Sequence, residues 1–303
     1  MTAATTPCPV CGSDEAQPHR VISDTIRIVR CRRCGLLYRR PRPADVASSY
    51  DAAYYSEDYE AHADGRGRNY LADQDRLLAS FDAHIAELER RSPPGRLLDV
   101  GCALGFLLEA ARRRGWRVSG MDFSAFAVDY AQRTFHVPVQ RGHVNEISFA
   151  PAAFDVITAF EYIEHVEDPV RVLQHLRPWL RRDGLLVMTT PNAASWRARR
   201  HPETCVGFLE ERHLSYFTPS TMRRLLTLAG FRLLELRTDI PVVSMAQLAQ
   251  AGVSSSSAQQ ARALVNRYAP WLKRGIRRLA GYLCPGDSIK VYAIPQPAAG
   301  APR

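Results

Sequence analysis

The sequence predicts an α/β fold, with a seven-stranded, mostly parallel sheet covered by helices on both faces and a small N-terminal module. From residue 96 onward, short apolar runs of strand character alternate with segments of helical character, which is typical of a parallel sheet. Near the N-terminus, two closely spaced cysteine pairs indicate a separate unit. At 303 residues and 46% hydrophobic content, the chain is long enough for one α/β core and a small appended domain.

The strongest signal lies in residues 96–124. The apolar run Leu97–Val100 predicts a strand, and small residues follow it at every second position, namely Gly101, Ala103 and Gly105. The backbone can therefore turn tightly and leave room for a ligand. A helix expected over Leu107–Arg114 directs its first N–H groups at that turn. Asp122 ends the next strand, where a carboxylate can accept two ribose hydroxyls, so we expect a ligand that contains a ribose.

This segment resembles the cofactor site of class I S-adenosylmethionine-dependent methyltransferases, whose pattern is acidic-x-Gly-x-Gly-x-Gly with a second acid ending the following strand. The resemblance covers most of residues 70–294 and implies a Rossmann-like domain. Asp99 before the turn distinguishes the pattern from dinucleotide binding, because an acid there suits a cationic ligand. A glycine-rich turn of another parallel α/β protein is the alternative. The cofactor-binding residues that the resemblance implies are Asp99, Gly101, Ala103, Gly105, Asp122, Phe123, His143, Val144 and Phe160.

Two of these positions depart from the family pattern. Ala103 replaces the middle glycine and adds one methyl group. His143 stands in the turn after the third strand, where the family usually carries an acid toward the adenine. A neutral histidine can still accept a hydrogen bond from the adenine amine, and the backbone of Val144 is the second contact we expect there.

The rest of the chain continues the α/β pattern. Further strands are expected at 154–159, 182–192, 231–240 and 287–295. The second of these is expected to be entered through a turn at Asp183–Gly184. Thr218 is expected to cap a helix that has Pro219 in its first turn and Gly230 as its terminator.

Four of the seven cysteines form two Cys-x-x-Cys pairs with nineteen residues between them: Cys8, Cys11, Cys31 and Cys34. This is zinc-ribbon spacing, in which the four thiolates bind one tetrahedral ion. Gly12 and Gly35 follow the two pairs and relieve the crowded backbone. Two disulfides or a redox dithiol are the alternatives. The sequence shows no signal peptide and no membrane-spanning run, so we expect a reducing cytoplasm and one structural Zn²⁺ ion.

The cysteine pairs followed by YDAAYYSEDY and the cofactor domain resemble the zinc-binding bacterial methyltransferases, which include deoxysugar C-methyltransferases and other tailoring enzymes of secondary metabolism. The resemblance implies a zinc ribbon over 1–45, a helical linker or lid over 46–92, and a methyltransferase domain over 93–303. Full sugar C-methyltransferases carry a larger C-terminal domain after the seventh strand, and we do not expect such a domain here. The resemblance therefore does not specify a sugar or a carbon acceptor, and we expect a small-molecule acceptor of unspecified kind. The residues expected to cover or line the acceptor site are Tyr54, Tyr55, Tyr59 and Tyr216.

An insertion is expected at about 241–285, between the sixth and seventh strands. It contains no acidic residue, and four apolar residues at helical spacing predict an amphipathic helix with a basic opposite face: Leu272, Ile276, Leu279 and Leu283. We expect this helix to pack on the sheet or to cover the active site. Contact with an acidic substrate, a lipid surface or a partner chain is the alternative.

The formal charge of +9 is carried almost entirely by arginine. Aromatic and basic residues are not interleaved as in proteins that read single-stranded nucleic acid, so nucleic acid is not the partner we expect. The predicted function is transfer of a methyl group from S-adenosylmethionine to a small-molecule acceptor, in natural-product or sugar tailoring. Two alternatives remain at this point. One is an RNA-modifying methyltransferase that holds RNA with its ribbon and arginines, and the other is a non-catalytic, cofactor-binding scaffold.

Methyl transfer to a hydroxyl or a carbon acid requires a base, and two histidines lie after the fourth and fifth strands. His213 follows the fifth strand, and Glu210 and Glu211 precede it and can orient its ring. In the related sugar enzymes, a histidine beside an acid in this connection is the proposed base. His165 is expected to be mainly structural and is the second candidate.

Overall fold

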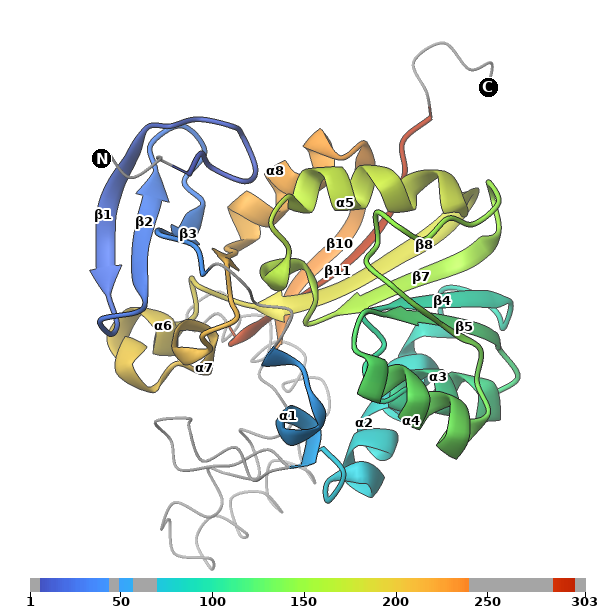
Figure 1. The fold of residues 1–303 in the computed structure, drawn as a ribbon. Coiled ribbons are helices and arrows are strands. Elements are labelled where there is room, and N and C mark those ends of the chain that lie inside the picture. The colour runs from blue at the N-terminus through green and yellow to red at the C-terminus, as the bar shows by residue number, and fades with distance from the viewer. Residues whose placement is uncertain (1–5, 44–48, 57–69, 240–285, 298–303) are drawn as a thin grey trace, which may run out of the picture.

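The computed structural model describes the chain except for residues 1–5, 44–48, 57–69, 240–285 and 298–303. Its centre is a seven-stranded sheet of order β10-β11-β8-β7-β4-β5-β6 (Figure 1). The strands are β4 (Arg96–Val100), β5 (Arg117–Asp122), β6 (Val139–Arg141), β7 (Phe154–Phe160), β8 (Leu180–Pro191), β10 (Phe231–Asp239) and β11 (Ser288–Pro295). Strands β4, β5, β6, β7 and β8 pair in parallel, and β11, the one described strand of this sheet with the opposite direction, pairs antiparallel with both β8 and β10. The predicted fold is therefore confirmed.

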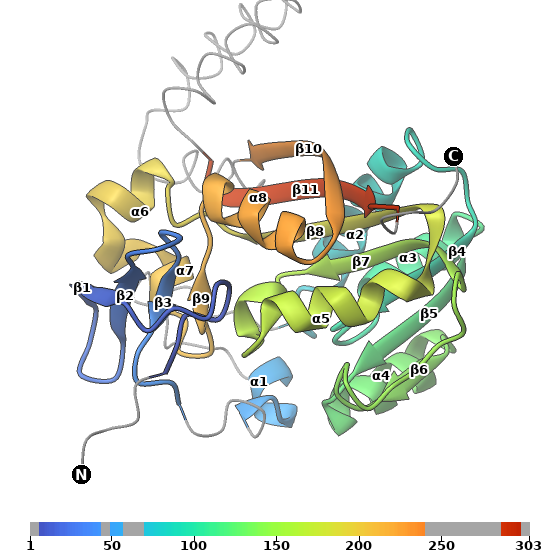
Figure 2. The same ribbon diagram turned by 90° about the horizontal axis from the view of Figure 1, so that it is seen from above.

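Helices cover both faces of this sheet (Figures 1 and 2). One face packs against α2 (Gln74–Leu88), α3 (Phe106–Arg113) and α4 (Ala125–Phe135), and the other against α5 (Pro169–Leu176) and α8 (Pro219–Leu228). Because apolar helices lie on both sides, central strands such as β7 are buried almost throughout. The expected capping of α8 is present, since the Thr218 side chain accepts from the Thr221 N–H and Pro219 begins the helix.

The turn expected at Asp183–Gly184 is present, as part of an irregularity near the start of β8. A Cβ built on Gly184 would lie 3.0 Å from the backbone N and O of Arg181, so the chain turns tightly between these two residues. The register with β7 shifts there, so that Phe154 pairs with Leu180 and Val156 with Leu185. The extra residues form a turn-like bulge, and β7 pairs with the strand on both sides of it.

A second, smaller sheet lies beside the first. It consists of β1 (Ala16–Val21), β2 (Arg27–Cys31), β3 (Leu37–Arg39) and β9 (Ser215–Tyr216), all antiparallel. Its first three strands form the N-terminal cysteine module, whereas β9 comes from the connection after β8. Figure 2 shows this sheet at one end of the molecule, next to the short helices α6 and α7.

The remaining described elements are short. They are α1 (Ala52–Ser56), α6 (Trp196–Arg200), α7 (Val206–Leu209), η2 (Ile163–His165), η3 (Arg177–Trp179) and η4 (Pro202–Thr204). The insertion expected at about 241–285 lies outside the described residues, and so does Tyr59. Among the helices that the structure describes, none has the length and apolar character needed to span a bilayer.

Candidate active site

The carboxyl ends of β4 and β5 meet at the glycine turn. Gly101 and Gly105 adopt φ values of +70° and +81°, and Ala103 is held at +46°, a left-handed conformation that costs an ordinary residue about 1–2 kcal/mol. A side chain at position 101 would bring its Cβ to 2.5 Å from Cδ2 of Tyr162, so only glycine fits there. The tight turn that the small residues predicted is present, although Ala103 adopts a strained backbone.

Two buried carboxyl groups flank this turn. Asp99 accepts a 2.6 Å hydrogen bond from the Thr158 hydroxyl, and burial raises the pKa of Asp99 to about 7. Asp122 accepts 2.9 Å bonds from the backbone N–H groups of Ala103 and Ser124, and burial raises its pKa as well. Each carboxylate oxygen can accept a second bond, so Asp122 can hold the turn closed and still accept ribose hydroxyls.

The residues expected around an adenine lie beside Asp122. The rings of Phe123 and His143 stack with centroids 5.2 Å apart and planes 8° apart, and Val144 is buried next to them. Phe160 lies elsewhere: its ring packs on α2, 5.3 Å from the ring of His84. The structure thus gathers three of the four aromatic or apolar residues of the expected set, and the Phe160 ring faces a helix.

The tyrosines that follow the N-terminal module cover this edge of the sheet. Tyr55 is buried and stacks on Phe126, and its ring meets that of Tyr54 at 4.8 Å. Tyr50, which sequence reasoning did not select, contacts residues of several elements. Its carbonyl accepts a 2.8 Å bond from the Ser124 hydroxyl, and its ring meets that of Phe123 at 5.3 Å.

The two candidate histidines lie next to each other, with ring centroids 4.7 Å apart. His213 donates from Nδ1 to the Gly207 carbonyl at 2.8 Å, which makes Nε2 the basic nitrogen of the neutral ring. Nε2 lies 3.9 Å from Glu164 Oε1. Glu164 is 1% exposed, neither of its carboxylate oxygens has a hydrogen-bond partner among the described residues, and burial raises its pKa well above the usual range.

His165 has a different environment. The Tyr50 hydroxyl lies 2.9 Å and the Arg212 carbonyl 3.2 Å from its Nδ1. Burial, followed by the neighbouring His213, lowers the pKa of His165 to about 3, so its ring stays neutral. One ligand atom from each of Glu164, His165 and His213 lies within 4.8 Å of the others, an arrangement that could also hold a metal ion.

Of the two glutamates expected to orient His213, Glu211 points elsewhere in the structure. Glu211 is exposed, and its carboxylate accepts a bond from the Thr25 hydroxyl of the N-terminal module. Glu210 is buried and forms a 2.9 Å ion pair with Arg212. The expectation that Glu211 orients the ring needs correction. Glu210 still interacts with His213, whose charge lowers the Glu210 pKa, and Glu164 Oε1 lies 3.9 Å from His213 Nε2.

Tyr216 lies on the other side of His213. It is 4% exposed, and its hydroxyl donates to the His213 carbonyl at 3.4 Å. Together with His213 it lines a small, mostly apolar pocket whose other walls are Pro191, Asn192, Ala193, Cys205, Gly207, Phe208 and Ser215.

Two tyrosines connect the glycine turn with the histidine pair. Tyr162 packs on Gly101 and directly precedes η2, which carries Glu164 and His165. Tyr50 reaches from Ser124 to His165. The acids of the turn and the histidines therefore line one continuous edge of the sheet, at the carboxyl ends of the parallel strands, where α/β proteins bind ligands.

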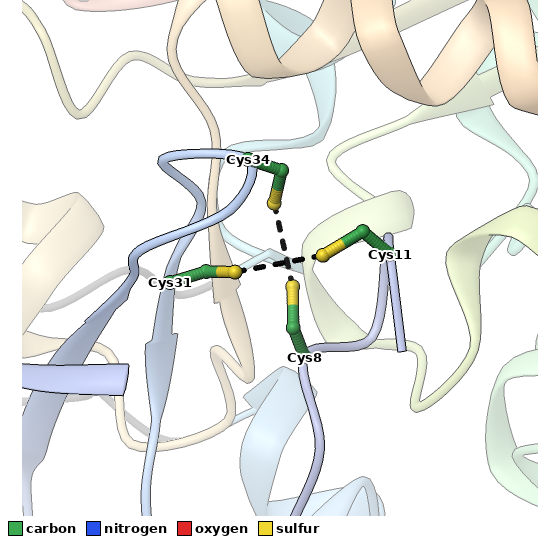
Figure 3. A group of neighbouring side chains, drawn as sticks. All are labelled: Cys8, Cys11, Cys31 and Cys34. Atoms are coloured by element: carbon green, nitrogen blue, oxygen red, sulfur yellow. Dashed lines mark hydrogen bonds between the residues drawn. The ribbon is translucent and has the colours of Figure 1, made fainter. Parts of the chain in front are cut away.

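The four cysteines of the N-terminal module converge on one point (Figure 3). The Sγ atoms of Cys8 and Cys34 and those of Cys11 and Cys31 are 3.5 Å apart, and all four lie within 4.8 Å of one another. These separations are too long for disulfides. Four thiolates at 2.3 Å from a tetrahedral zinc ion would be about 3.8 Å apart, so the cluster has the dimensions of such a site.

Comparison with protein families gives one extended match. The model of a methyltransferase domain family matches residues 70–236, more than half of the chain. Among curated proteins, the ubiquinone biosynthesis O-methyltransferase of Actinobacillus pleuropneumoniae is 35% identical over 111 residues, which cover 32% of this chain and 46% of that protein. The mitochondrial enzyme of the same name from Schizosaccharomyces pombe is 35% identical over 102 residues, covering 31% of this chain and 37% of that protein. The chain thus spans less than half the length of these relatives.

Solved structures share the fold. A SAM-dependent methyltransferase from Archaeoglobus fulgidus aligns with a TM-score of 0.52 and 19% identity, over 75% of this chain and 100% of that chain. A phosphoethanolamine N-methyltransferase from Haemonchus contortus, solved with S-adenosylmethionine, aligns with a TM-score of 0.50 and 18% identity, over 72% of this chain and 53% of that chain.

Proposed function

The chain belongs to the methyltransferase domain family, and we propose that it transfers the methyl group of S-adenosylmethionine to a hydroxyl group of a small molecule. The observation that carries the proposal is the pair of buried carboxyl groups at a glycine turn. Asp99 and Asp122 are 4% and 7% exposed, and no basic side chain is recorded in hydrogen-bond contact with either among the described residues. Two buried acids in such surroundings suit a ligand that carries a positive charge and hydroxyl donors.

The residues at the turn fit this cofactor. Asp122 offers lone pairs to the ribose hydroxyls, Phe123, His143 and Val144 form a flat apolar wall for the adenine, and Asp99 lies where a cationic group gains from a carboxylate. The bound cofactor supplies a methyl group on a sulfonium, which is already electrophilic. The protein therefore has to align the acceptor and remove its proton.

His213 is the residue we assign to that proton. Its Nδ1–H is held by the Gly207 carbonyl, so an acceptor proton goes to Nε2. Glu164, 3.9 Å from Nε2, is a positioning residue that stabilises the imidazolium when its carboxyl group is ionised. Because burial raises the pKa of Glu164, ionisation requires a higher pH than for an exposed glutamate, and turnover is expected to rise with pH.

The N-terminal module supports a finer proposal. In this view residues 1–45 form a ribbon with one structural Zn²⁺ ion, 46–92 cover the site, and 93–303 form the methyltransferase domain. The relatives named above are O-methyltransferases of ubiquinone biosynthesis, which supports an oxygen acceptor. The joined cysteine cluster supports a role in tailoring a natural product or a sugar. The residues assigned to the acceptor side are Tyr54, Tyr55, Tyr59 and Tyr216, with His165 as a neutral neighbour of the base.

Two measurements test the enzyme proposal. Calorimetry with S-adenosylmethionine is expected to show binding by the full chain, weakened by about 1–3 kcal/mol in Asp122→Asn, which keeps the shape of the side chain but removes its charge. A screen of small hydroxylated acceptors for S-adenosylhomocysteine release is expected to find a substrate that His213→Gln methylates about a hundredfold more slowly. The proposal fails if the chain does not bind the cofactor, and the base is elsewhere if His213→Gln keeps full activity.

Metal analysis tests the zinc proposal. Protein purified without chelator is expected to contain one zinc per chain, and Cys31→Ser is expected to contain much less. The control is Cys205→Ser, which removes a described cysteine that is not part of the cluster. A zinc content near zero in the unchanged protein, or the absorption spectrum of an iron–sulfur cluster, contradicts the assignment.

A further inference from the structure

The N-terminal cysteine module shares a sheet with the segment that carries His213. Strand β3 pairs antiparallel with β9, with Leu37 opposite Tyr216 and Tyr38 opposite Ser215. The Arg39 N–H extends this pairing by donating to the Leu214 carbonyl at 2.9 Å. The Leu214 N–H, in turn, donates to the Glu164 carbonyl at 2.9 Å. The residue after His213 is therefore held on both sides by backbone hydrogen bonds.

The Arg39 side chain adds a second connection between the two segments. It is 6% exposed, and its guanidinium donates to the Glu211 carbonyl and, at 2.9 Å, to the Thr25 carbonyl. One planar group thus connects the loop between β1 and β2 with the connection just before His213. A buried arginine that bonds two carbonyls is costly to desolvate, and its cost is offset only if both acceptors stay in place.

We propose that Arg39 is a positioning residue for the His213 base: through the β3–β9 pairing and the Glu211 carbonyl, the N-terminal module sets where the His213 ring lies. The inference rests on the proposed role of His213. It adds that the module takes part in catalysis through backbone geometry, without a residue of β3 needing to touch the acceptor. A displacement of about 1 Å at a catalytic group can cost about a hundredfold in rate, so this support matters for turnover.

The other end of β3 is held by the cysteine cluster. The Cys31 N–H donates to the Leu36 carbonyl at 2.9 Å, and Leu36 and Tyr38 are fully buried in the same core cluster as Cys8 and Cys31. Strand β3 therefore runs directly from the cysteine knuckle to the Arg39 contact. A disturbance of β3 is expected to reach residues 211–216 before it reaches the glycine turn.

The test compares Arg39→Met with Arg39→Lys, which keeps the charge but not the planar fork. Amide hydrogen exchange is followed in the peptide 210–217, together with kcat, its pH profile and the affinity for S-adenosylmethionine. We expect Arg39→Met to exchange faster in 210–217 and to lose roughly 10- to 100-fold in kcat while cofactor affinity stays unchanged. Arg39→Lys is expected to be intermediate in both measurements, because a single ammonium cannot reproduce the planar fork that bonds two separate carbonyls.

Arg27→Met is the matched control, since Arg27 is an exposed arginine on the neighbouring strand β2. It is expected to leave exchange and kcat unchanged. The inference is overturned if Arg39→Met, with unchanged cofactor affinity, exchanges normally in 210–217, or if it exchanges faster but keeps full kcat while His213→Gln is impaired. If His213→Gln is itself fully active, the proposed base is wrong, and faster exchange in Arg39→Met then supports only the connection between the two segments.

Discussion

The buried carboxyl group of Asp99 is expected to make cofactor affinity depend on pH. Asp99 is 4% exposed, its recorded hydrogen bond comes from the Thr158 hydroxyl, and burial raises its pKa to about 7. The group is therefore mostly protonated in the cofactor-free protein below that pH. A cation beside Asp99 favours the ionised form, so binding has to release this proton. We expect the affinity for S-adenosylmethionine to weaken about tenfold for each pH unit below about 7 and to level off above it.

The same group is expected to affect the free energy of unfolding in the opposite direction. Its pKa rises from 3.8 to about 7 on folding, which corresponds to about 4 kcal/mol. Because the folded state favours the protonated form, this contribution is complete below pH 3.8 and is lost as the pH rises through about 7. Asp99→Asn has no such proton. Relative to the unchanged protein, it should gain up to about 4 kcal/mol in unfolding free energy between acidic and mildly basic pH.

Calorimetry in two buffers with different ionisation enthalpies, at about pH 6, measures the released proton directly. Urea unfolding of both proteins across the same pH range measures the stability difference, and each comparison uses Asp99→Asn as the variant without the titrating group. The reasoning is refuted if cofactor affinity in the unchanged protein does not respond to pH below about 7, or if Asp99→Asn shows the same response.

Three further outcomes are expected. Gly101→Ala should abolish cofactor binding in calorimetry, because its Cβ would lie 2.5 Å from Tyr162, and near-normal affinity contradicts the described turn. Tyr50→Phe removes the hydroxyl 2.9 Å from His165 Nδ1 and should lower kcat by less than His213→Gln does, as steady-state kinetics can establish. Removing the proposed zinc ion with a chelator should speed amide exchange in 210–217 through β3, and unchanged exchange there would show that the cluster does not support this segment.

Much of the fold could be predicted because short sequence patterns determine it locally. The apolar run at 97–100, the small residues after it and the acid at 122 correspond to β4, the turn and the end of β5. The start of β8 was harder to predict. The chain turns tightly at 181–184, as the turn residues Asp183 and Gly184 indicate, but Leu180 before the turn still pairs with Phe154 of β7.

The surroundings of the candidate base His213 were less predictable, since their contacts join distant parts of the chain. His213 was selected by its position after a strand, but its carboxylate neighbour Glu164 lies in another connection. Adjacent glutamates before His213 point in different directions: Glu210 is buried against Arg212, and Glu211 is exposed. A sequence does not show which of two neighbouring side chains points inward when the segment has no regular period. Tyr50 was missed because its contacts are with Ser124 and His165, which lie far from it in the sequence.

The sheet of the N-terminal module includes a strand from a distant part of the chain, β9. The sequence presents the module as an appended ribbon, yet the last strand of its sheet comes from the connection that carries His213. Without β9, strand β3 would be an exposed edge with unpaired backbone groups. Without β3, the residues after His213 would lose the Arg39 N–H that donates to the Leu214 carbonyl and the two residue pairs of the β3–β9 ladder. Each segment therefore supplies backbone hydrogen-bond partners to the other, so the cysteine cluster and the proposed base belong to one structural unit.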